Sequence, residues 1–180
     1  MRGAEAVLSK SSLLGKPVVI KKRIAKKYRN RRLDERLRRE RTRGEARILH
    51  KAKIAGVRCP VVLEVDDFSI TMTFIKGERP GMTKKQAEEA GLMLAKLHSA
   101  DIIHGDYTPA NLLLDKSMFV IDFGLGFISN DIEDKAVDVF TMLRAISKKD
   151  EFIRGYESYE KAKTVLRRMK DVEKRIRYAF

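Results

Sequence analysis

The chain has 180 residues, enough for one ordinary domain or for two small lobes that share a cleft. Hydrophobic residues make up 43% of it, a usual share for a folded protein, whereas charged residues make up 36%, well above the usual quarter. No apolar run approaches the roughly 18 residues that a membrane span needs, and the N-terminus lacks the apolar core and small-residue cleavage site of a secretion signal, so we expect a cytoplasmic protein without membrane contact. Cys59 is the only cysteine, which excludes an internal disulfide and zinc sites built from several thiolates.

Positive charge gathers in two segments of the chain. Residues 21–58 carry 17 Lys or Arg residues against four acidic ones, and residues 161–180 carry eight against two, within a net charge of +14. Such clusters attract polyanions, nucleic acid above all, through phosphate contacts that do not depend on base sequence. Solvated helix faces are the alternative explanation, and the clusters alone do not decide between the two.

The first 75 residues predict a small sheet and one long helix. Apolar β-formers after Pro17 predict a strand over residues 17–24, and a short strand at residues 4–8 is a candidate to precede it. Apolar residues at helical spacing predict a basic helix over residues 33–55, which Gly56 ends. Two further strands are expected on either side of a turn at Asp66 and Asp67, over residues 61–65 and 69–75.

The rest of the chain predicts mainly helices. Gly77, Pro80 and Gly81 interrupt regular structure, and we place the boundary between two lobes there. Thr83 and Gln86 form a capping box that starts a helix over residues 84–99. Short strands are expected around a polar loop, at residues 102–103, 112–114 and 118–121. Two more helices are expected, one capped by Asn130 with Glu133 and running to about Ser147, and a basic one over residues 156–176.

Two polar loops carry the chemistry. The first is His104-Gly105-Asp106-Tyr107-Thr108-Pro109-Ala110-Asn111, and Asp122-Phe123-Gly124 follows eleven residues after it. Phosphoryl transfer from ATP needs a carboxylate to orient the attacking hydroxyl or water, and oxygen ligands to hold Mg²⁺ against the phosphates. Asp106, Asn111 and Asp122 offer such groups. Each alone is weak, but their order and spacing together are specific.

These loops resemble the catalytic loop and the metal motif of the protein-kinase-like superfamily. The resemblance implies an α+β, two-lobed protein-kinase-like fold of minimal size. Its small β-rich N-lobe would be residues 1–75, and its mainly helical, truncated C-lobe with a basic tail would be residues 76–180.

The same resemblance implies roles for individual residues. Lys21 would contact the α and β phosphates of ATP, and Glu45 on the long helix would hold it by an ion pair. Asp106 would be the base or the water-positioning carboxylate, while Asn111 and Asp122 would bind Mg²⁺ between the phosphates. A hinge formed by Met72, Thr73 and Ile75 would bind adenine through its backbone at Thr73 and Ile75. The roof over the nucleotide would contain a single glycine and consist of Gly3, Ala4, Glu5 and Ala6.

Departures from ordinary protein kinases narrow the family. Gly105 replaces the usual catalytic-loop arginine, and Thr108 replaces the usual lysine. Only 13 residues separate Gly124 from Asp138, which resembles the buried aspartate that supports the catalytic loop. A full activation segment cannot fit there, which puts a groove for protein substrates in doubt. The three histidines are expected to be structural rather than catalytic: His50, His98 and His104.

The whole pattern is similar to the small atypical kinase/ATPase subunit of the KEOPS complex, in its archaeal form. The similarity includes Lys21-Lys22-Arg23, Arg41-Thr42 with Glu45-Ala46, and the tail from Val172 to Tyr178. It implies a protein that uses ATP and Mg²⁺ and supports threonylcarbamoyladenosine synthesis in tRNA. The C-lobe and basic tail would contact the threonylcarbamoyl transferase subunit, the N-lobe a small KEOPS subunit, and the basic clusters tRNA.

Three alternatives stay open. A small-molecule phosphotransferase of the aminoglycoside or choline type also carries His-Gly-Asp, but only residues 125–180 follow the metal motif, which leaves little room for a substrate-binding insertion. A small RIO-type kinase is a nearer relative. A tRNA-binding scaffold that keeps only vestigial nucleotide binding is the non-enzymatic alternative.

Overall fold

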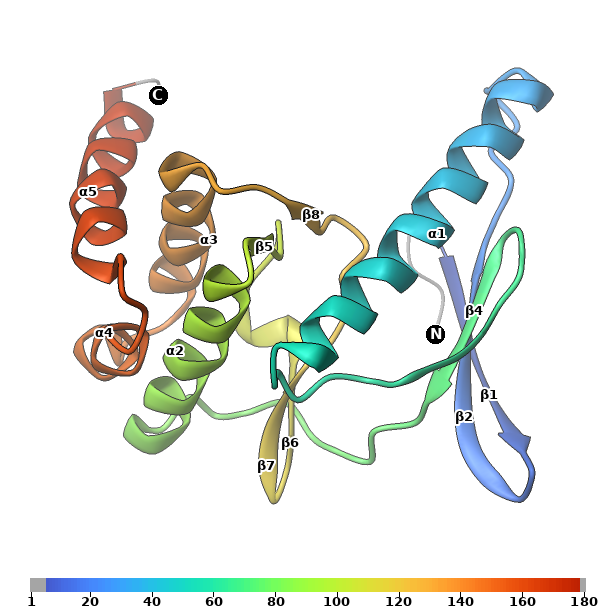
Figure 1. Cartoon of the computed structure of the whole chain (residues 1–180), viewed down its shortest axis with the longest axis horizontal. Coiled ribbons are helices and arrows are strands. Elements are labelled where there is room, and N and C mark those ends of the chain that lie inside the picture. The colour runs from blue at the N-terminus through green and yellow to red at the C-terminus, as the bar shows by residue number, and fades with distance from the viewer. Residues whose placement is uncertain (1–5, 179–180) are drawn as a thin grey trace.

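The computed structural model describes residues 6–178, with side chains up to residue 175. Its N-terminal part is a four-stranded antiparallel sheet in the order β1-β2-β4-β3, with one long helix beside it (Figure 1). The strands are β1 (Ala6–Leu13), β2 (Lys16–Arg23), β3 (Val62–Val65) and β4 (Ser69–Thr73). The predicted strand after Pro17 is confirmed, and the strand before it extends to Leu13.

β1 and β2 form a hairpin across Leu14 and Gly15, whose φ angles of 49° and 74° are both left-handed. Two left-handed residues give a turn that matches the twist of the flanking strands. Beyond Val7, the residues of β1 are exposed on both faces, so β1 lacks the alternating pattern by which a half-buried strand is recognised in a sequence.

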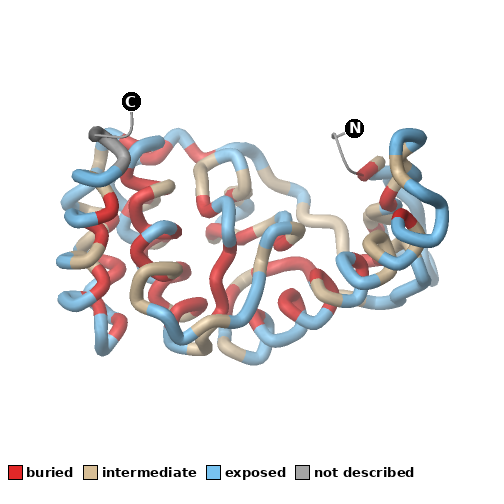
Figure 2. Tube along the Cα trace, turned by 90° about the horizontal axis from the view of Figure 1, so that it is seen from above, coloured by how far each residue is buried: buried red, intermediate tan, exposed pale blue. Residues whose placement is uncertain are grey.

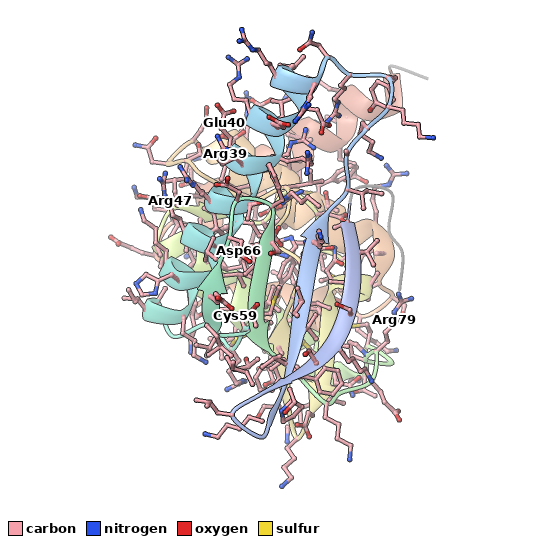
Figure 3. All side chains as sticks on the ribbon, turned by 90° about the vertical axis from the view of Figure 1, so that its right-hand side faces the viewer. Arg39, Glu40, Arg47, Cys59, Asp66 and Arg79 are labelled. Carbon is pink, nitrogen blue, oxygen red and sulfur yellow. The ribbon has the colours of Figure 1, made fainter. Side chains whose placement is uncertain are left out.

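Helix α1 (Arg31–Ile54) is the predicted long basic helix. The side chain of Asn30 caps it by accepting a hydrogen bond from the Arg32 N–H. One face, which includes Glu45, Leu49 and Ala52, is buried, while charged side chains such as Glu40 and Arg47 project outward (Figure 3). Gly56 follows the helix with a φ of 76°, a conformation that favours glycine.

The C-terminal part is mainly helical: α2 (Lys84–Ser99), η1 (Pro109–Asn111), α3 (Ile132–Ala145), α4 (Lys149–Tyr156) and α5 (Ala162–Tyr178). Thr83 and Gln86 form the predicted capping box at the start of α2. Two predictions are wrong here. Asp131 rather than Asn130 caps α3. The basic helix expected over residues 156–176 is α5, but it begins only at Ala162, and the sequence analysis does not predict α4, which precedes it with a turn through Tyr159 between the two.

Two small antiparallel sheets lie between the large sheet and these helices. β6 (Leu112–Asp115) pairs with β7 (Ser117–Val120), and β5 (Ile102–Ile103) pairs with β8 (Phe127–Ile128). These pairings bring the two polar loops together, because the loops connect β5 to β6 and β7 to β8.

α2 and α4 cross closely through two glycines. A Cβ atom at Gly91 would clash with the carbonyl oxygen of Phe152, and one at Gly155 would clash with that of Glu88. A continuous set of buried side chains then connects the helices to α1 and the sheet, and the positions along the chain where residues are buried are coloured red in Figure 2. The predicted α+β fold with a sheet in its N-terminal part and helices in its C-terminal part is confirmed. No helix within residues 6–178 has the length and apolar character to cross a membrane.

Candidate active site

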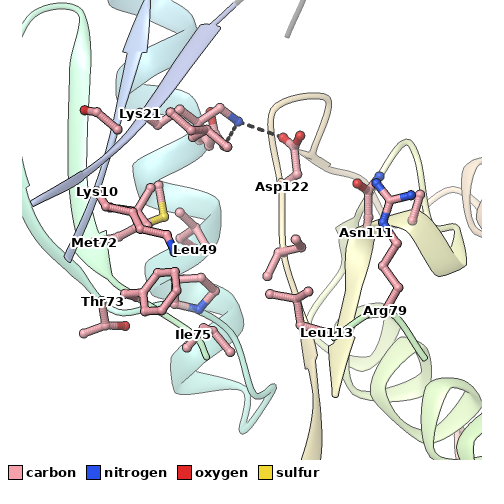
Figure 4. Close-up of a pocket in the computed structure, with 18 residues that line it drawn as sticks. Lys10, Lys21, Leu49, Met72, Thr73, Ile75, Arg79, Asn111, Leu113 and Asp122 are labelled. Carbon is pink, nitrogen blue, oxygen red and sulfur yellow. Dashed lines mark hydrogen bonds and ion pairs between the residues drawn. The ribbon is translucent and has the colours of Figure 1, made fainter. Parts of the chain in front are cut away.

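A cleft of about 410 Å³ lies between the large sheet and the β6–β7 hairpin (Figure 4). This volume is in the range of small-molecule sites. Apolar side chains line much of it, including Val19, Leu49, Met72, Leu113 and Ile121. Polar side chains from both sides meet at one end: Lys21 and Glu45 from β2 and α1, and Asn111 and Asp122 from the two polar loops.

Lys21 connects the two sides of the cleft. Its Nζ donates a hydrogen bond to Glu45 Oε1 at 2.6 Å and another to Asp122 Oδ1 at 2.7 Å. These contacts join β2, α1 and the second polar loop, which are far apart in the sequence. The expected ion pair between Lys21 and Glu45 is therefore present.

Glu45 has a second cationic partner that the sequence analysis did not single out. Arg23 Nη2 donates a hydrogen bond to Glu45 Oε2 at 2.7 Å, and both side chains are almost fully buried. The signal in the sequence is the spacing, because Arg23 follows Lys21 by two residues on one strand and alternate residues share a face. It is weak among 39 basic residues.

Asp122 adopts a left-handed backbone with a φ of 61°, an uncommon conformation for a residue other than glycine. Its Oδ1 also accepts a hydrogen bond from the Gly124 N–H at 3.3 Å. Burial raises the pKa of this carboxyl, but the nearby Lys21 ammonium and the hydrogen bonds outweigh it, so the pKa lies below its ordinary value. Asp122 is thus ionised at neutral pH, as a metal ligand must be.

The first polar loop holds its Asp and Asn in contact. Asn111 Nδ2 donates to both the carbonyl oxygen and Oδ2 of Asp106, each at 2.8 Å. The Asp106 side chain remains exposed. Asn111 therefore fixes the direction of the Asp106 carboxylate, while its own amide oxygen is the atom suited to a metal.

The first polar loop is held in place by hydrogen bonds to two buried side chains, Asp138 and His104. Asp138 on α3 accepts hydrogen bonds from the backbone N–H groups of His104 and Gly105, at 2.6 Å and 2.9 Å. The ring nitrogens of His104 contact the Ile121 carbonyl and the Asp106 N–H. Burial lowers the pKa of His104, although Asp138 opposes the shift. Asp138 and His104 thus have structural positions, as the sequence predicts.

The surroundings of Gly105 explain why this position holds glycine. Its φ is 79°, and a Cβ atom there would lie 2.5 Å from the carbonyl oxygen of Leu125. The arginine that ordinary protein kinases carry at this place would not fit without moving the segment after Gly124. Of the other histidines, His98 is buried against Tyr156, and His50 is exposed on α1, so His50 is not part of the interior.

The predicted nucleotide-contact residues are partly described. Met72, Thr73 and Ile75 line the cleft at its apolar end. The Thr73 N–H donates to the Val61 carbonyl and so is not free to bind a ligand. In the predicted roof, Ala6 begins β1, and the rest of the motif lies outside the described residues: Gly3, Ala4 and Glu5.

The donor set fits Mg²⁺. The residues that the structure describes contain no group of three His, Cys, Asp or Glu side chains suited to a metal. Asn111 and Asp122 instead line the same cleft and offer two oxygen ligands. Mg²⁺ commonly binds through one or two protein ligands together with substrate phosphates and water.

Comparison with known proteins identifies the family. The RIO domain model matches residues 18–141. The chain is also 44% identical to the probable serine/threonine-protein kinase BUD32 homolog of Archaeoglobus fulgidus, over 89% of this chain and 88% of that protein. The chain is a RIO-domain protein of the Bud32 family. The family resemblance inferred from the sequence is confirmed, and the RIO relationship considered as an alternative is part of that identity.

Other relatives are longer than this RIO-domain chain. It is 41% identical to the probable bifunctional tRNA threonylcarbamoyladenosine biosynthesis protein of Methanocaldococcus jannaschii, over 98% of this chain but 36% of that protein. The chain thus spans about a third of the length of such bifunctional relatives. Among solved structures, the Rio2 kinase of Chaetomium thermophilum in its ADP/Mg²⁺-phosphoaspartate complex has a TM-score of 0.68 at 15% identity, covering 100% of this chain and 70% of its own. That similarity confirms the protein-kinase-like fold.

Proposed function

We propose that this chain is an ATP- and Mg²⁺-dependent kinase or ATPase that supports the synthesis of threonylcarbamoyladenosine in tRNA. The observation that carries the proposal is the arrangement of Lys21 and Glu45 on one side of the cleft, facing Asp122 and Asn111 on the other, with Asp106 held by Asn111. Relatives named for tRNA threonylcarbamoyladenosine biosynthesis support the biological role.

Each polar side chain has a role in this proposal. Lys21 binds the α and β phosphates, and Glu45 keeps its ammonium at the cleft. Asn111 and Asp122 hold Mg²⁺, which neutralises charge on the phosphates. Asp106 orients the attacking water or hydroxyl, and its link to Asn111 fixes that direction. Catalysis then comes from positioning and from charge neutralisation, with no covalent step on the protein.

The apolar end of the cleft would hold adenine. Val19, Leu49 and Leu113 lie there beside the segment from Met72 to Ile75. The Thr73 carbonyl and the Ile75 N–H are the proposed hydrogen-bonding groups for the base. Gly3, Ala4, Glu5 and Ala6 remain the proposed roof.

We also propose which part of the chain contacts which partner. Residues 1–75 form one lobe, which contacts a small KEOPS subunit, and residues 76–180 form the other. The second lobe and its basic tail contact the threonylcarbamoyl transferase subunit. The basic clusters contact tRNA, and the complex works in the cytoplasm.

The first test follows γ-labelled ATP with the full chain, its transferase partner and tRNA. We expect label mainly in free phosphate, release that rises with transferase and tRNA, and loss of release in Asp106→Ala. Asp115→Ala is the matched control, since Asp115 is an exposed carboxylate on the β6–β7 hairpin and should leave release unchanged.

The other outcomes separate the alternatives. Label that accumulates on protein and ignores tRNA would identify a protein kinase. Transfer to a small alcohol or amine acceptor would identify a small-molecule phosphotransferase. Nucleotide binding without turnover, unchanged in Asp106→Ala, would identify a tRNA-binding scaffold.

A further inference from the structure

The Glu45 carboxylate is shared by two cations from one strand. Lys21 binds Oε1 at 2.6 Å and Arg23 binds Oε2 at 2.7 Å. Lys21 and Arg23 stand two residues apart on β2, so both side chains point to the same face of the sheet, toward α1. One oxygen of Glu45 is therefore assigned to the cleft lysine and the other to the arginine behind it.

Arg23 is held at both ends. Its backbone N–H donates to the Phe68 carbonyl at 2.8 Å, and its guanidinium donates to the Arg41 carbonyl on α1 at 3.4 Å. The residue is 5% exposed. A side chain that is fixed in this way presents its charge to Glu45 at little further cost in conformational entropy.

Glu45 is only one of the acceptors that the Lys21 ammonium must bind. It also binds Asp122, and in the proposed function it must bind the phosphates of ATP. As the phosphates take up the charge of Lys21, the buried Glu45 carboxylate needs another cation, because an unpaired buried charge is strongly unfavourable. Arg23 is already in contact with the second oxygen.

We propose that Arg23 is a positioning residue for ATP. It holds the Glu45 carboxylate in place, and so leaves Lys21 available to the phosphates. The inference rests on the proposed function of the cleft and extends it, since it adds a residue that acts through Glu45 without touching nucleotide.

Arg23→Met and Arg23→Lys test this proposal. Loss of one charged hydrogen-bond partner is expected to raise the KM for ATP and the Kd for Mg²⁺-ADP by roughly tenfold in Arg23→Met, with a much smaller change in kcat. Arg23→Lys restores one donor to Glu45 and should recover most of the affinity. Should Arg23→Met fail to fold by circular dichroism, Arg23→Gln replaces it.

Arg38→Met is the matched control. Arg38 is also mostly buried on α1 and forms a 2.7 Å ion pair, but with Asp34 rather than Glu45. It should lower the unfolding midpoint without raising the KM. Equal nucleotide affinity in the unmodified chain and Arg23→Met, or equal losses in Arg23→Met and Arg38→Met, would overturn the proposal.

A double variant tests whether Arg23 acts through Glu45. If it does, Arg23→Met combined with Glu45→Gln should bind Mg²⁺-ADP no more weakly than Glu45→Gln alone. Multiplied losses would contradict the inference. Failure of the proposed function looks different, because the unmodified chain itself would then bind no Mg²⁺-ADP.

Discussion

At the scale of single residues, the cleft combines opposite charges that pair with one another. The Lys21 ammonium lies 2.7 Å from Asp122 and lowers the pKa of that carboxyl against the effect of burial. Asp122 is also left-handed, a strained conformation that the neighbouring Gly124 N–H helps to hold. The carboxylate is thus charged and pointed toward the cleft.

Replacing Asp122 should stop Mg²⁺-dependent turnover. Asp122→Asn keeps the shape but removes the charge, and we expect ATP hydrolysis to fall by about 100-fold or more. Because the pKa of Asp122 is lowered, protonation of this group should not limit turnover at any pH between about 5 and 8. Phosphate release measured over that range checks both statements. Asp115→Asn is the control, and equal turnover in the two variants would remove Asp122 from the site.

The two buried histidines predict how stability depends on pH. Burial lowers the pKa of both His98 and His104 below the ordinary value of 6.5. Below that pH the unfolded chain binds protons that the folded chain excludes, so their contribution to stability is complete above it and is lost as the pH falls toward the folded pKa values.

Urea unfolding measures this effect. The midpoint should fall between about pH 7.5 and about pH 5.5, and the fall should be smaller in His104→Gln. His50→Gln provides the control, because His50 is exposed and should leave the pH dependence unchanged. A midpoint that rises on acidification would contradict the prediction.

The sequence indicates the residues of the two polar loops because their spacing is a local property. It indicates Arg23 only weakly and does not explain Gly105. The contact between Arg23 and Glu45 bridges 22 positions of the chain and depends on how α1 lies against β2. The close approach of Gly105 to Leu125 depends on how the segment after Gly124 returns past the first loop.

At the scale of elements, the periodic spacing of apolar residues predicts a helix or strand correctly where one face of that element is buried. The sequence predicts helices α1 and α2 and strand β2 within a few residues, because apolar and polar positions recur with the period of the element. β1 extends further than expected because most of it is exposed on both faces. The sequence analysis misses α4, which has only eight residues, and it begins α5 six residues early, because the turn at Tyr159 buries an aromatic ring as a helix face would.

Replacing glycine by alanine is expected to have opposite effects on stability at two positions, Gly91 at the crossing of α2 and α4 and Gly44 on α1. Ala favours a helix over Gly by about 1 kcal/mol, but a methyl group at Gly91 would meet the backbone of α4 and force the helices apart. We expect Gly91→Ala to lower the free energy of unfolding by about 1–3 kcal/mol.

Gly44→Ala is the control for helix propensity. Apart from its chain neighbours and the nearby backbone of α1, no atom lies within 4 Å of the position of a Cβ at Gly44, so this change should stabilise the chain by about 0.5–1 kcal/mol. Urea denaturation of both variants measures the difference. Stabilisation by Gly91→Ala would show that α2 and α4 leave room for a methyl group between them.

At the scale of the whole molecule, net charge and its placement matter separately. The chain carries +14, and α1 presents a stripe of exposed arginines at helical spacing, made of Arg32, Arg36, Arg43 and Arg47. This stripe lies on the part of α1 that is exposed to solvent, opposite the buried face that carries Glu45. A polyanion bound there would leave the cleft open.

Neutralising the stripe should therefore weaken tRNA binding without changing ATP turnover. Replacing the four arginines with glutamine should reduce the slope of log K against log salt by about 0.7–0.9 for each phosphate that an arginine no longer neutralises, measured with tRNA between low and physiological salt. The control replaces four exposed lysines elsewhere, which lowers the net charge equally: Lys16, Lys84, Lys85 and Lys116. If net charge alone attracts tRNA, the slope will fall equally in both variants. If α1 is the binding surface, the slope will fall far more in the arginine variant, and phosphate release without tRNA will be the same in both.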